Sequence, residues 1–454
     1  MSLPLSSAIL FANFSTVILT SVCLRIPVQP VFLVWWGIDF IILRKLGYSA
    51  DDLQNHTSGA IQKASGPILT MLSVGAMTGI FAECGIIAQI ARTGIRWIKP
   101  SVILPGSYLL CFLLAFLTGS AFGAISSGGI ICLSIARSLQ LPDAYTVSAI
   151  ITGAFIAYCC SPFSELVPIA SSLLNISPGR TWKISARLMA PAFAICIVVY
   201  GILNMRIVSS GLPATESLQL SAAQAGVYPL SALSVLTVLL PMSILFLMLF
   251  FRLPVPAALL SGALTAGLMG KFFLGKSASE LLLAAWSGGA TMDQGAALSG
   301  GMQSMSGTIL LLIVSFGLFG LLDTANILQT VLFPLFRKSG NAVVRQLIMT
   351  LSAFLVTAFS ASALCSILFL YHFSAPVYDR NGWDKGELIM SGLAGSVALS
   401  LIVPWHSNAV TPAAFLGTVP TEHIPMMFFS AVPSLILILS SIINLHSHRN
   451  VLNS

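Results

Sequence analysis

Two short stretches of the chain place a proline and several polar side chains inside otherwise apolar sequence. The first stretch is SPFSE, with Ser161, Pro162, Ser164 and Glu165. The second is IVPWHSNAVTP, with Pro404 followed by His406, Ser407 and Asn408. A proline inside a helix frees backbone carbonyls, and carbonyl, hydroxyl and carboxylate oxygens are the ligands that hard cations prefer. These residue types favour a site for Na⁺ or a proton, and no nucleophile motif or metal-ligand spacing accompanies them.

The composition requires a membrane to hold these stretches. Of 454 residues, 56% are hydrophobic and only 8% are charged, whereas a soluble domain has about 25% charged residues. Apolar runs of about 20 residues cross a bilayer as helices, because lipid offers an open backbone no hydrogen-bond partner. The net charge of +7 comes from Lys and Arg residues that lie singly or in small groups at segment ends, which argues against nucleic-acid binding. We therefore predict an all-α polytopic membrane protein.

The apolar runs form two sets that resemble each other. LRIPVQP from Leu24 is repeated as FRLPVPA from Phe251, LTGSAFGAIS from Leu117 as AFSASALCSI from Ala358, and Pro162 as Pro404. The offset between the copies grows from 227 to 242 and never falls back, which indicates an internal duplication. We predict a first membrane repeat at 1–205, a polar linker at 206–228 and a second membrane repeat at 229–454, with roughly 11–14 membrane segments in all.

Duplicated halves are typical of secondary transporters. We predict two inverted repeats with broken helices and re-entrant hairpins. An odd number of crossings in each half would invert the two halves, but a short fifth run in each could be a hairpin, so counting leaves the parity open. The positive-inside rule gives no orientation, because matching loops carry similar positive charge.

Other polar residues could complete the site. Thr118 and Ser120 lie in TGSAFGAISSGG, where small hydroxyl residues permit either close helix packing or a hairpin tip at mid-membrane. Besides Glu165, we consider Glu83 and Asp323 as proton carriers, because an ionisable group in an apolar run is costly and so suggests function. The structural alternative places these acids at helix ends in the headgroup region. His406, beside a membrane proline, would titrate near neutral pH.

GAFIAYCCSPFSELVPIAS and LIVPWHSNAVTPAAFLGTVPTEHIPMMFF resemble the two signature regions of the NhaC family of sodium/proton antiporters, within the ion transporter superfamily. TGSAFGAISSGG is similar to its TGTSWGT-type segment, with Phe122 at the tryptophan position, and MLSVGAMTGIFAECGII to its early GALIGTW-type helix. The resemblance runs from about Leu46 to about Leu437. It implies a multi-pass carrier of the cytoplasmic membrane that exchanges Na⁺ for H⁺, with hairpins and broken helices meeting at mid-membrane. Some relatives exchange organic acids together with these ions.

The chain also departs from the family pattern at its charged positions. Tyr158 and Cys159 stand where the Asp and Lys of the family's GDK-x-SPLSDTT pattern would fall, and Glu165 stands at its second Asp. No acid occurs between Gly392 and Leu399. Glu83 is an acid where the family usually has a small residue. Because this chain has fewer carboxylates than a typical family member, a neutral or organic solute is favoured more strongly here than for that member.

Two functions remain as hypotheses. The first is a Na⁺/H⁺ antiporter working by alternating access, in which Glu165 binds the cation or proton with Ser161 and Ser164. The alternative is a Na⁺- or H⁺-coupled carrier of a small carboxylate or amino acid, held by the helix N-termini after the prolines. A channel or a membrane enzyme is not favoured, because no filter repeat, voltage-sensor helix or catalytic constellation occurs. We expect no cofactor, no metal beyond transported Na⁺, no nucleic-acid partner and a location in the cytoplasmic (inner) membrane, with a homodimer as one option.

Overall fold

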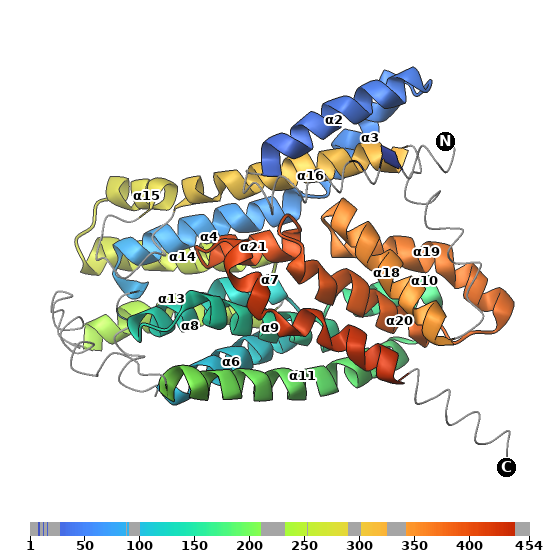
Figure 1. Cartoon of the computed structure of the whole chain (residues 1–454). Helices are drawn as coiled ribbons and strands as arrows, with labels where there is room; N and C mark the ends of the chain where they lie inside the picture. The colour runs from blue at the N-terminus through green and yellow to red at the C-terminus, as the bar shows by residue number, and fades with distance from the viewer. Residues whose placement is uncertain are drawn as a thin grey trace, which may run out of the picture.

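Most of the described residues are helical in the computed structural model (Figure 1). The described residues are 8, 9, 12, 16, 28–87, 89, 100–209, 232–251, 253–288, 301–324 and 342–440, and no strand occurs among them. Within these residues, seven helices are long and apolar enough to cross a membrane, or up to nine if each of two bent pairs is one span. The protein is therefore an all-α polytopic membrane protein, as predicted. The estimate of 11–14 segments includes runs outside the described residues. Most of the polar linker at 206–228 also lies outside them.

Within the described residues, the apolar runs form helices. The first half contains α2 (Val28–Lys45), α3 (Ala50–Gln62), α4 (Ser65–Glu83), η2 (Pro100–Val102), α6 (Ile103–Thr118), α7 (Ala121–Ala124), η3 (Ile125–Gly129), α8 (Ile130–Ser138), α9 (Asp143–Cys160), α10 (Leu166–Leu174) and α11 (Pro178–Ser209). The second half contains α13 (Ala232–Phe250), α14 (Val255–Phe273), α15 (Ala278–Ser287), η4 (Met302–Met305), α16 (Ser306–Thr324), α18 (Ala342–Ser360), α19 (Ala363–Asn381), α20 (Gly386–Gly392), η5 (Leu393–Ala398), η6 (Leu399–Ile402), α21 (Ser407–Phe415), α22 (Pro420–His423), η7 (Ile424–Met426) and η8 (Phe428–Ser430).

Residues with a left-handed backbone show that the two halves share one fold. Four pairs of such residues match between the halves: Gly47 and Gly275, Gly119 and Ala361, Gln140 and Gly382, Asn175 and Gly417. The last three pairs are all 242 residues apart. A left-handed residue ends a helix and turns the chain, so shared positions mean shared turns. The alignment of Leu117 with Ala358 is therefore wrong by one residue, because an alanine takes the left-handed position that glycine takes in the first half.

Each half contains an antiparallel helical hairpin. In the first half, a side chain at Gly128 on η3 would contact Leu114 of α6, so α7, η3 and α8 run back along α6. In the second half, Ser366 Oγ on α19 donates to the Ala353 carbonyl of α18 at 2.6 Å. The tips lie at residues 118–120 and 360–362, where each second arm begins on a serine N-cap. Each half thus contains a helical hairpin, and its re-entrant path in the membrane stays a prediction.

The helix that follows each hairpin is broken at the predicted proline. In the first half, α9 ends before Ser161 and α10 resumes at Leu166; in the second half, the segment Gly386–Ile402 and α21 meet at 50°. Lys385, at the start of α20, donates to the Leu174 carbonyl at the end of α10. Arg137, which is paired with Asp143 at the start of α9, donates to the Leu416 carbonyl at the end of α21. Each broken helix therefore begins where the other ends, so the repeats are inverted, as predicted.

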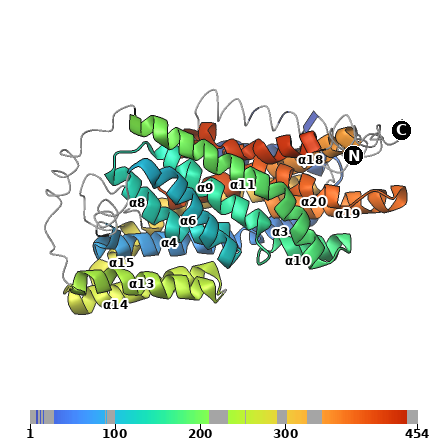
Figure 2. The ribbon, with the colours of Figure 1, turned by 90° about the horizontal axis from the view of Figure 1, so that it is seen from below.

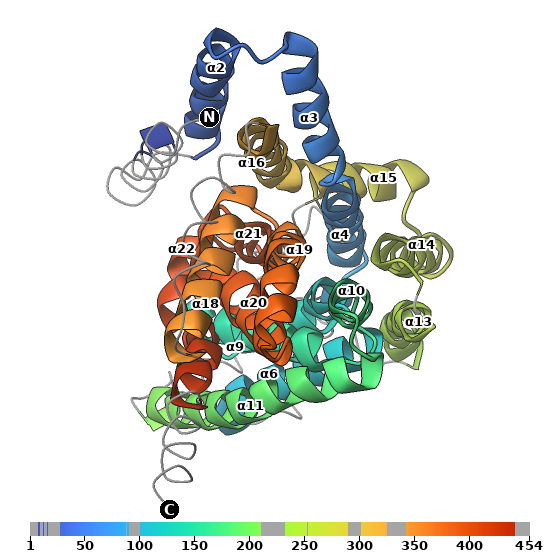
Figure 3. The same cartoon turned by 90° about the vertical axis from the view of Figure 1, so that its right-hand side faces the viewer.

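The helices divide into two layers (Figure 3). A flanking layer consists of α2–α4 and α13–α16, which form an arc along one side of a core made of α6–α11 and α18–η8. Both layers draw on both halves of the chain. The closest backbone approaches occur within a layer, as where Gly79 of α4 lies against Ala284 of α15, or Gly153 of α9 against Tyr108 of α6. Among the described glycines, none makes such an approach from one layer to the other.

Candidate functional site

The hairpin tip of the first half lies directly on its proline break. Gly119 has φ +72° and lies so close to the Phe163 carbonyl that no side chain would fit at this position. A Cβ there would also be 3.0 Å from the Ser164 nitrogen. This backbone contact joins two groups of residues that the sequence predicted separately: Thr118 and Ser120 on the tip; Ser161, Pro162, Ser164 and Glu165 on the break.

The second half repeats this arrangement with different residues. The Ser407 backbone N–H donates to the Ala361 carbonyl at 3.3 Å, which fixes the tip at 360–362 to the break after Pro404. Ser360 Oγ and the Ser362 carbonyl are 3.0 Å apart within the tip. The predicted residues His406, Ser407 and Asn408 thus lie on the second break.

Both breaks are fixed to the first hairpin arm by a side-chain donor. Ser161 Oγ donates to the Phe116 carbonyl at 2.7 Å, and Trp405 Nε1 donates to the Ala358 carbonyl at 2.8 Å. The two acceptors are 242 residues apart and so occupy equivalent positions near the end of α6 and of α18. A carbonyl near a helix end needs such a partner when water is absent. The breaks are therefore fixed features rather than loose turns.

A polar side chain spans each break. The Tyr158 hydroxyl, on the last turn of α9, donates to Glu165 Oε1 at 2.9 Å. In the second half, Asn408 Nδ2 donates to Ser400 Oγ at 2.9 Å. Tyr158 and Ser400 are equivalent by the offset of 242, whereas Glu165 is equivalent to Ser407, so the second break is spanned from the next residue, Asn408. The bond across the first break ends on a carboxylate, and the bond across the second break comes from a neutral amide.

Glu165 is exposed in the chain, and its hydrogen-bond partner is a hydroxyl rather than a cation. No lysine or arginine among the described residues forms an ion pair with it. Other acids of the core are compensated: Glu387 pairs with Arg345, and Asp143 with Arg137. A carboxylate without a fixed cation is free to take a mobile one.

His406 and Thr411 give the second break unused hydrogen-bonding capacity. His406 is fully buried, and its Nδ1 accepts from the Asn408 backbone N–H at 2.9 Å, which caps α21. Its Nε2 and the Thr411 Oγ1 have no partner among the described residues. Buried polar atoms without a partner are uncommon in native structures. The second break can therefore donate to or accept from a solute without adding charge.

The two halves contact each other close to these breaks. The post-break helix α10 packs on α19 of the second half, and α21 packs on η3 of the first. A row of edge-to-face aromatic rings crosses the interface: Tyr158, Phe155, Phe122 and Phe415, with successive centroids 6.0–6.3 Å apart. Phe122 lies two residues after the first hairpin tip, so its ring joins the two halves.

The other two predicted acids lie elsewhere. Glu83 is buried at the end of α4 and forms an ion pair with Lys276, in the turn between α14 and α15. The hydrogen bond with this carboxylate raises the pKa of Lys276. Asp323 is exposed one residue before the end of α16. Neither residue is part of the contacts that join the tips to the breaks.

Sequence reasoning missed the side chains that span the breaks. Ser400 was not singled out, and Tyr158 was noted only as a departure from a pattern. A usable signal existed: in each half a hydroxyl residue lies seven or eight positions before a polar residue, with the proline between them. Neither partner is informative alone, because hydroxyls are common in apolar helices.

Comparison with known proteins finds two family models and several similar transporters. The family model described as "Na+/H+ antiporter family" matches residues 183–444, and a model described as "C4-dicarboxylate anaerobic carrier" matches residues 3–205. The chain is 24% identical to the malate-2H⁺/Na⁺-lactate antiporter of Bacillus subtilis, covering 91% of this chain and 88% of the relative. It is also 24% identical to the Na⁺/H⁺ antiporter NhaC of Bacillus subtilis, with 87% of each covered. The arginine/ornithine antiporter ArcD of Halobacterium salinarum is 24% identical, with 89% and 84% covered.

The first family model covers more than half of the chain, including the second hairpin and break. The similar relatives extend over the first hairpin and break as well. With paired tips and breaks in two inverted repeats, the chain belongs to the Na⁺/H⁺ antiporter family and is a secondary antiporter of the membrane.

Proposed function

We propose that this antiporter exchanges Na⁺ for H⁺ at the two breaks, with Glu165 as the group that binds both. The observation that carries the proposal is the uncompensated carboxylate of Glu165, beside the backbone contact between tip and break. Ser161 and Ser164 on the break, and Thr118 and Ser120 on the tip, offer further oxygens. The similarity to proteins named Na⁺/H⁺ antiporter NhaC supports the same choice of ions.

A single carboxylate explains why the exchange would be coupled. A bare carboxylate is costly to move through the membrane interior, whereas a protonated or Na⁺-loaded one is nearly neutral. The carrier can therefore switch between its inward-open and outward-open states when Glu165 is loaded with Na⁺ or H⁺, but not when Glu165 is empty. Because Na⁺ and H⁺ compete for the same oxygens, each turnover returns one ion in exchange for the other.

The second break would complete the site with neutral groups. Ser407, Asn408 and His406 lie where the first half has its carboxylate, and they supply oxygens and a ring nitrogen. Adding a second carboxylate would add charge that a single Na⁺ cannot neutralise. We propose that the protein lies in the cytoplasmic membrane, because Na⁺ and H⁺ gradients exist across that membrane.

Everted membrane vesicles test the proposal. Respiration acidifies the vesicles, a pH-sensitive dye reports the gradient, and added Na⁺ should collapse it in the wild-type protein. Glu165→Gln should lose at least about 90% of the response, because the amide can neither ionise nor neutralise Na⁺. Glu422→Gln, an identical change at an exposed position, should respond like the wild type. An unchanged response of Glu165→Gln would refute this role for Glu165.

The organic-solute alternative requires a different measurement. Two similar relatives are named as carriers of malate and lactate or of arginine and ornithine, so these labelled compounds are the probes. Uptake into proteoliposomes would be followed with and without a Na⁺ gradient. We expect no gradient-dependent uptake. Uptake that follows the Na⁺ gradient would replace Na⁺/H⁺ exchange with coupled solute transport.

A further inference from the structure

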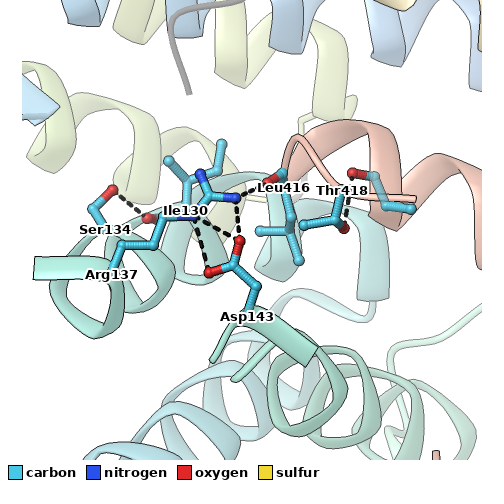
Figure 4. Close-up of polar contacts among 7 residues, drawn as sticks. Ile130, Ser134, Arg137, Asp143, Leu416 and Thr418 are labelled. Carbon is cyan, nitrogen blue, oxygen red and sulfur yellow. Dashed lines mark hydrogen bonds and ion pairs between the residues drawn. The ribbon is translucent and has the colours of Figure 1, made fainter. Parts of the chain in front are cut away.

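The last carbonyl of each post-break helix accepts a hydrogen bond from a cationic side chain, and that side chain belongs to the other half of the chain. The end of α21 is held by Arg137, which lies in the first half (Figure 4). The end of α10 is held by Lys385, which lies in the second half. The last carbonyls of a helix are unpaired within it and carry partial negative charge, so a cation there is stabilising.

The contact at α21 is built around a forked ion pair (Figure 4). Arg137 Nε lies 3.1 Å and 3.0 Å from the two Asp143 carboxylate oxygens, and Nη2 lies 2.7 Å from Oδ2. The same Nη2 donates to the Leu416 carbonyl at 3.4 Å. We refer to Arg137, Asp143 and Leu416 as the Arg137 latch.

The contact at α10 has the same parts. Lys385 Nζ lies 2.7 Å from Asp379 Oδ1 and donates to the Leu174 carbonyl at 3.1 Å. We refer to Lys385, Asp379 and Leu174 as the Lys385 latch. In both latches an acid holds the cation, and the cation holds the final carbonyl of the post-break helix.

The internal duplication makes the two latches equivalent position by position, with the charges exchanged. Arg137 corresponds to Asp379, Asp143 to Lys385, and Leu174 to Leu416, all at the offset of 242. The cation and the acid have therefore traded places between the halves, yet each half keeps one of each. Copying alone would have preserved the order, so what is retained is the contact itself: a paired cation at the end of the other half's helix.

The two latches lie at opposite ends of the molecule. Figures 1 and 2 show α8 toward one end of the long axis and α10 with α19 toward the other. The helices run along this axis, so its two ends correspond to the two membrane faces. The same conclusion follows from the broken helices, which run in opposite directions between the latches.

We propose that the two latches are the gates of the transport cycle, one at each membrane face. Arg137 and Lys385 are positioning residues: each holds a post-break helix against the hairpin of the other half and so closes the path from one face to the breaks. Both are closed in this structure, and transport requires each to open in turn. The inference rests on the protein being an alternating-access antiporter and does not depend on which ions it carries.

The burial of the two pairs makes the gates unequal. The side chains of Arg137 and Asp143 are 11% and 35% exposed, and those of Lys385 and Asp379 are 18% and 62% exposed. An ion pair open to water is worth less than a shielded one, and a forked arginine contact is stronger than a lysine contact. The Lys385 latch should therefore open more readily than the Arg137 latch.

Hydrogen–deuterium exchange on the purified protein tests the gates without any transport assay. Arg137→Gln should speed exchange of the backbone amides at 413–418 by about tenfold or more and leave those at 171–176 unchanged. Lys385→Gln should do the reverse, so each variant controls for the other. Faster exchange at both ends, or at neither, would show that the cations do not hold these helices separately.

A charge transposition separates gating from simple stability. Arg137→Asp and Asp143→Lys together give the first half the charge order that the second half already has. Each single variant should transport at least about tenfold more slowly than the wild type, and the double variant should recover to within about threefold of it. A double variant no faster than the single variants, with normal yield and a monodisperse profile on size exclusion, would overturn the proposal. If the wild type moves no Na⁺, the Na⁺/H⁺ assignment fails, and the exchange measurement still decides the latches.

Discussion

At the scale of single residues, the site depends on what each polar group lacks as much as on what it contacts. Glu165 has a hydroxyl partner and no fixed cation among the described residues, whereas the buried Glu83 is paired with Lys276. Two acids of the same charge therefore have different surroundings. In the proposed cycle Glu165 binds the mobile ion, whereas Glu83 holds two segments together.

Tyr158→Phe should weaken Na⁺ binding while preserving the fold. The change removes the hydroxyl that orients Glu165 but keeps the ring that packs on Phe155. A hydrogen bond to a carboxylate is worth on the order of 1 kcal/mol at an exposed site, so the apparent KM for Na⁺ should rise roughly threefold to tenfold. Dye dequenching at a series of Na⁺ concentrations measures it. Tyr145→Phe on the same helix, whose hydroxyl has no partner among the described residues, should change nothing. Equal effects of both variants would contradict the orienting role.

Gly119→Ala should abolish transport. The new Cβ would collide with the Phe163 carbonyl, and alanine is disfavoured at φ +72°. Together these effects cost about 2 kcal/mol or more and push the tip off the break. Gly106→Ala is the matched control, because this glycine lies on α6 with nothing within 4 Å of a new Cβ. Transport per folded molecule, measured in vesicles, should fall only for Gly119→Ala.

The residues of the site were predictable from sequence to the extent that they act locally. Pro162, Ser164 and Glu165 are neighbours in the chain, so a proline break with adjacent oxygens shows in the sequence itself. The contact between Gly119 and Phe163 joins segments more than 40 residues apart, and hydropathy contains no information about it. The equivalence of Gly119 and Ala361 was hidden for a physical reason: alanine rarely takes a left-handed backbone, so it gives no signal of a turn.

At the scale of elements, an ion pair joins α4 to the turn between α14 and α15. Glu83 and Lys276 lie in different halves, so the pair connects the part of the flanking layer from the first half to the part from the second half. Because the hydrogen bond raises the pKa of Lys276, its stabilising effect is complete below the unfolded pKa of about 10.4 and is lost only as pH rises through the higher folded value. The contribution of Lys276 to stability should therefore be constant between pH 6 and 9.

Glu83→Gln should lower the thermal midpoint by a similar amount at pH 6 and pH 9. The single change leaves a cation beside a buried amide, so the double variant Glu83→Gln with Lys276→Gln should regain part of the loss. Thermal unfolding followed by tryptophan fluorescence measures both. The pH profile of transport provides the contrast with proton carriage. A displaced pH optimum in Glu83→Gln would assign this acid to the proton path instead.

At the scale of the whole molecule, the contact between the two layers differs from the contacts within them. Tight backbone approaches join helices within the flanking layer and within the core, but none of the described glycines joins one layer to the other. Such close approaches resist sliding, and their absence permits it. We expect the core to shift against the flanking layer. The latches lie wholly within the core, so their opening is a separate, local movement of the post-break helices.

Disulfide trapping tests this movement. Gly123→Cys with Val255→Cys would link core to flanking layer, because a Cβ at residue 123 lies 3.4 Å from the Val255 side chain. Transport should stop on oxidation and return on reduction. Gly270→Cys lies beside the native Cys84, within the flanking layer, at 2.7 Å from Cβ to Sγ. The link it forms should leave transport unchanged. Full activity of the oxidised 123–255 pair would exclude sliding at this contact.

The unequal burial of the two ion pairs has a consequence for a cell whose two compartments differ in salinity. Asp379 is 62% exposed, so dissolved salt screens its attraction for Lys385, while the forked pair of Arg137 and Asp143 is shielded. A high salt concentration at the membrane face of the Lys385 latch would weaken that latch. The same concentration at the face of the Arg137 latch would change little. A protein built from two copies of one fold would thus distinguish outside from inside without any dedicated sensor.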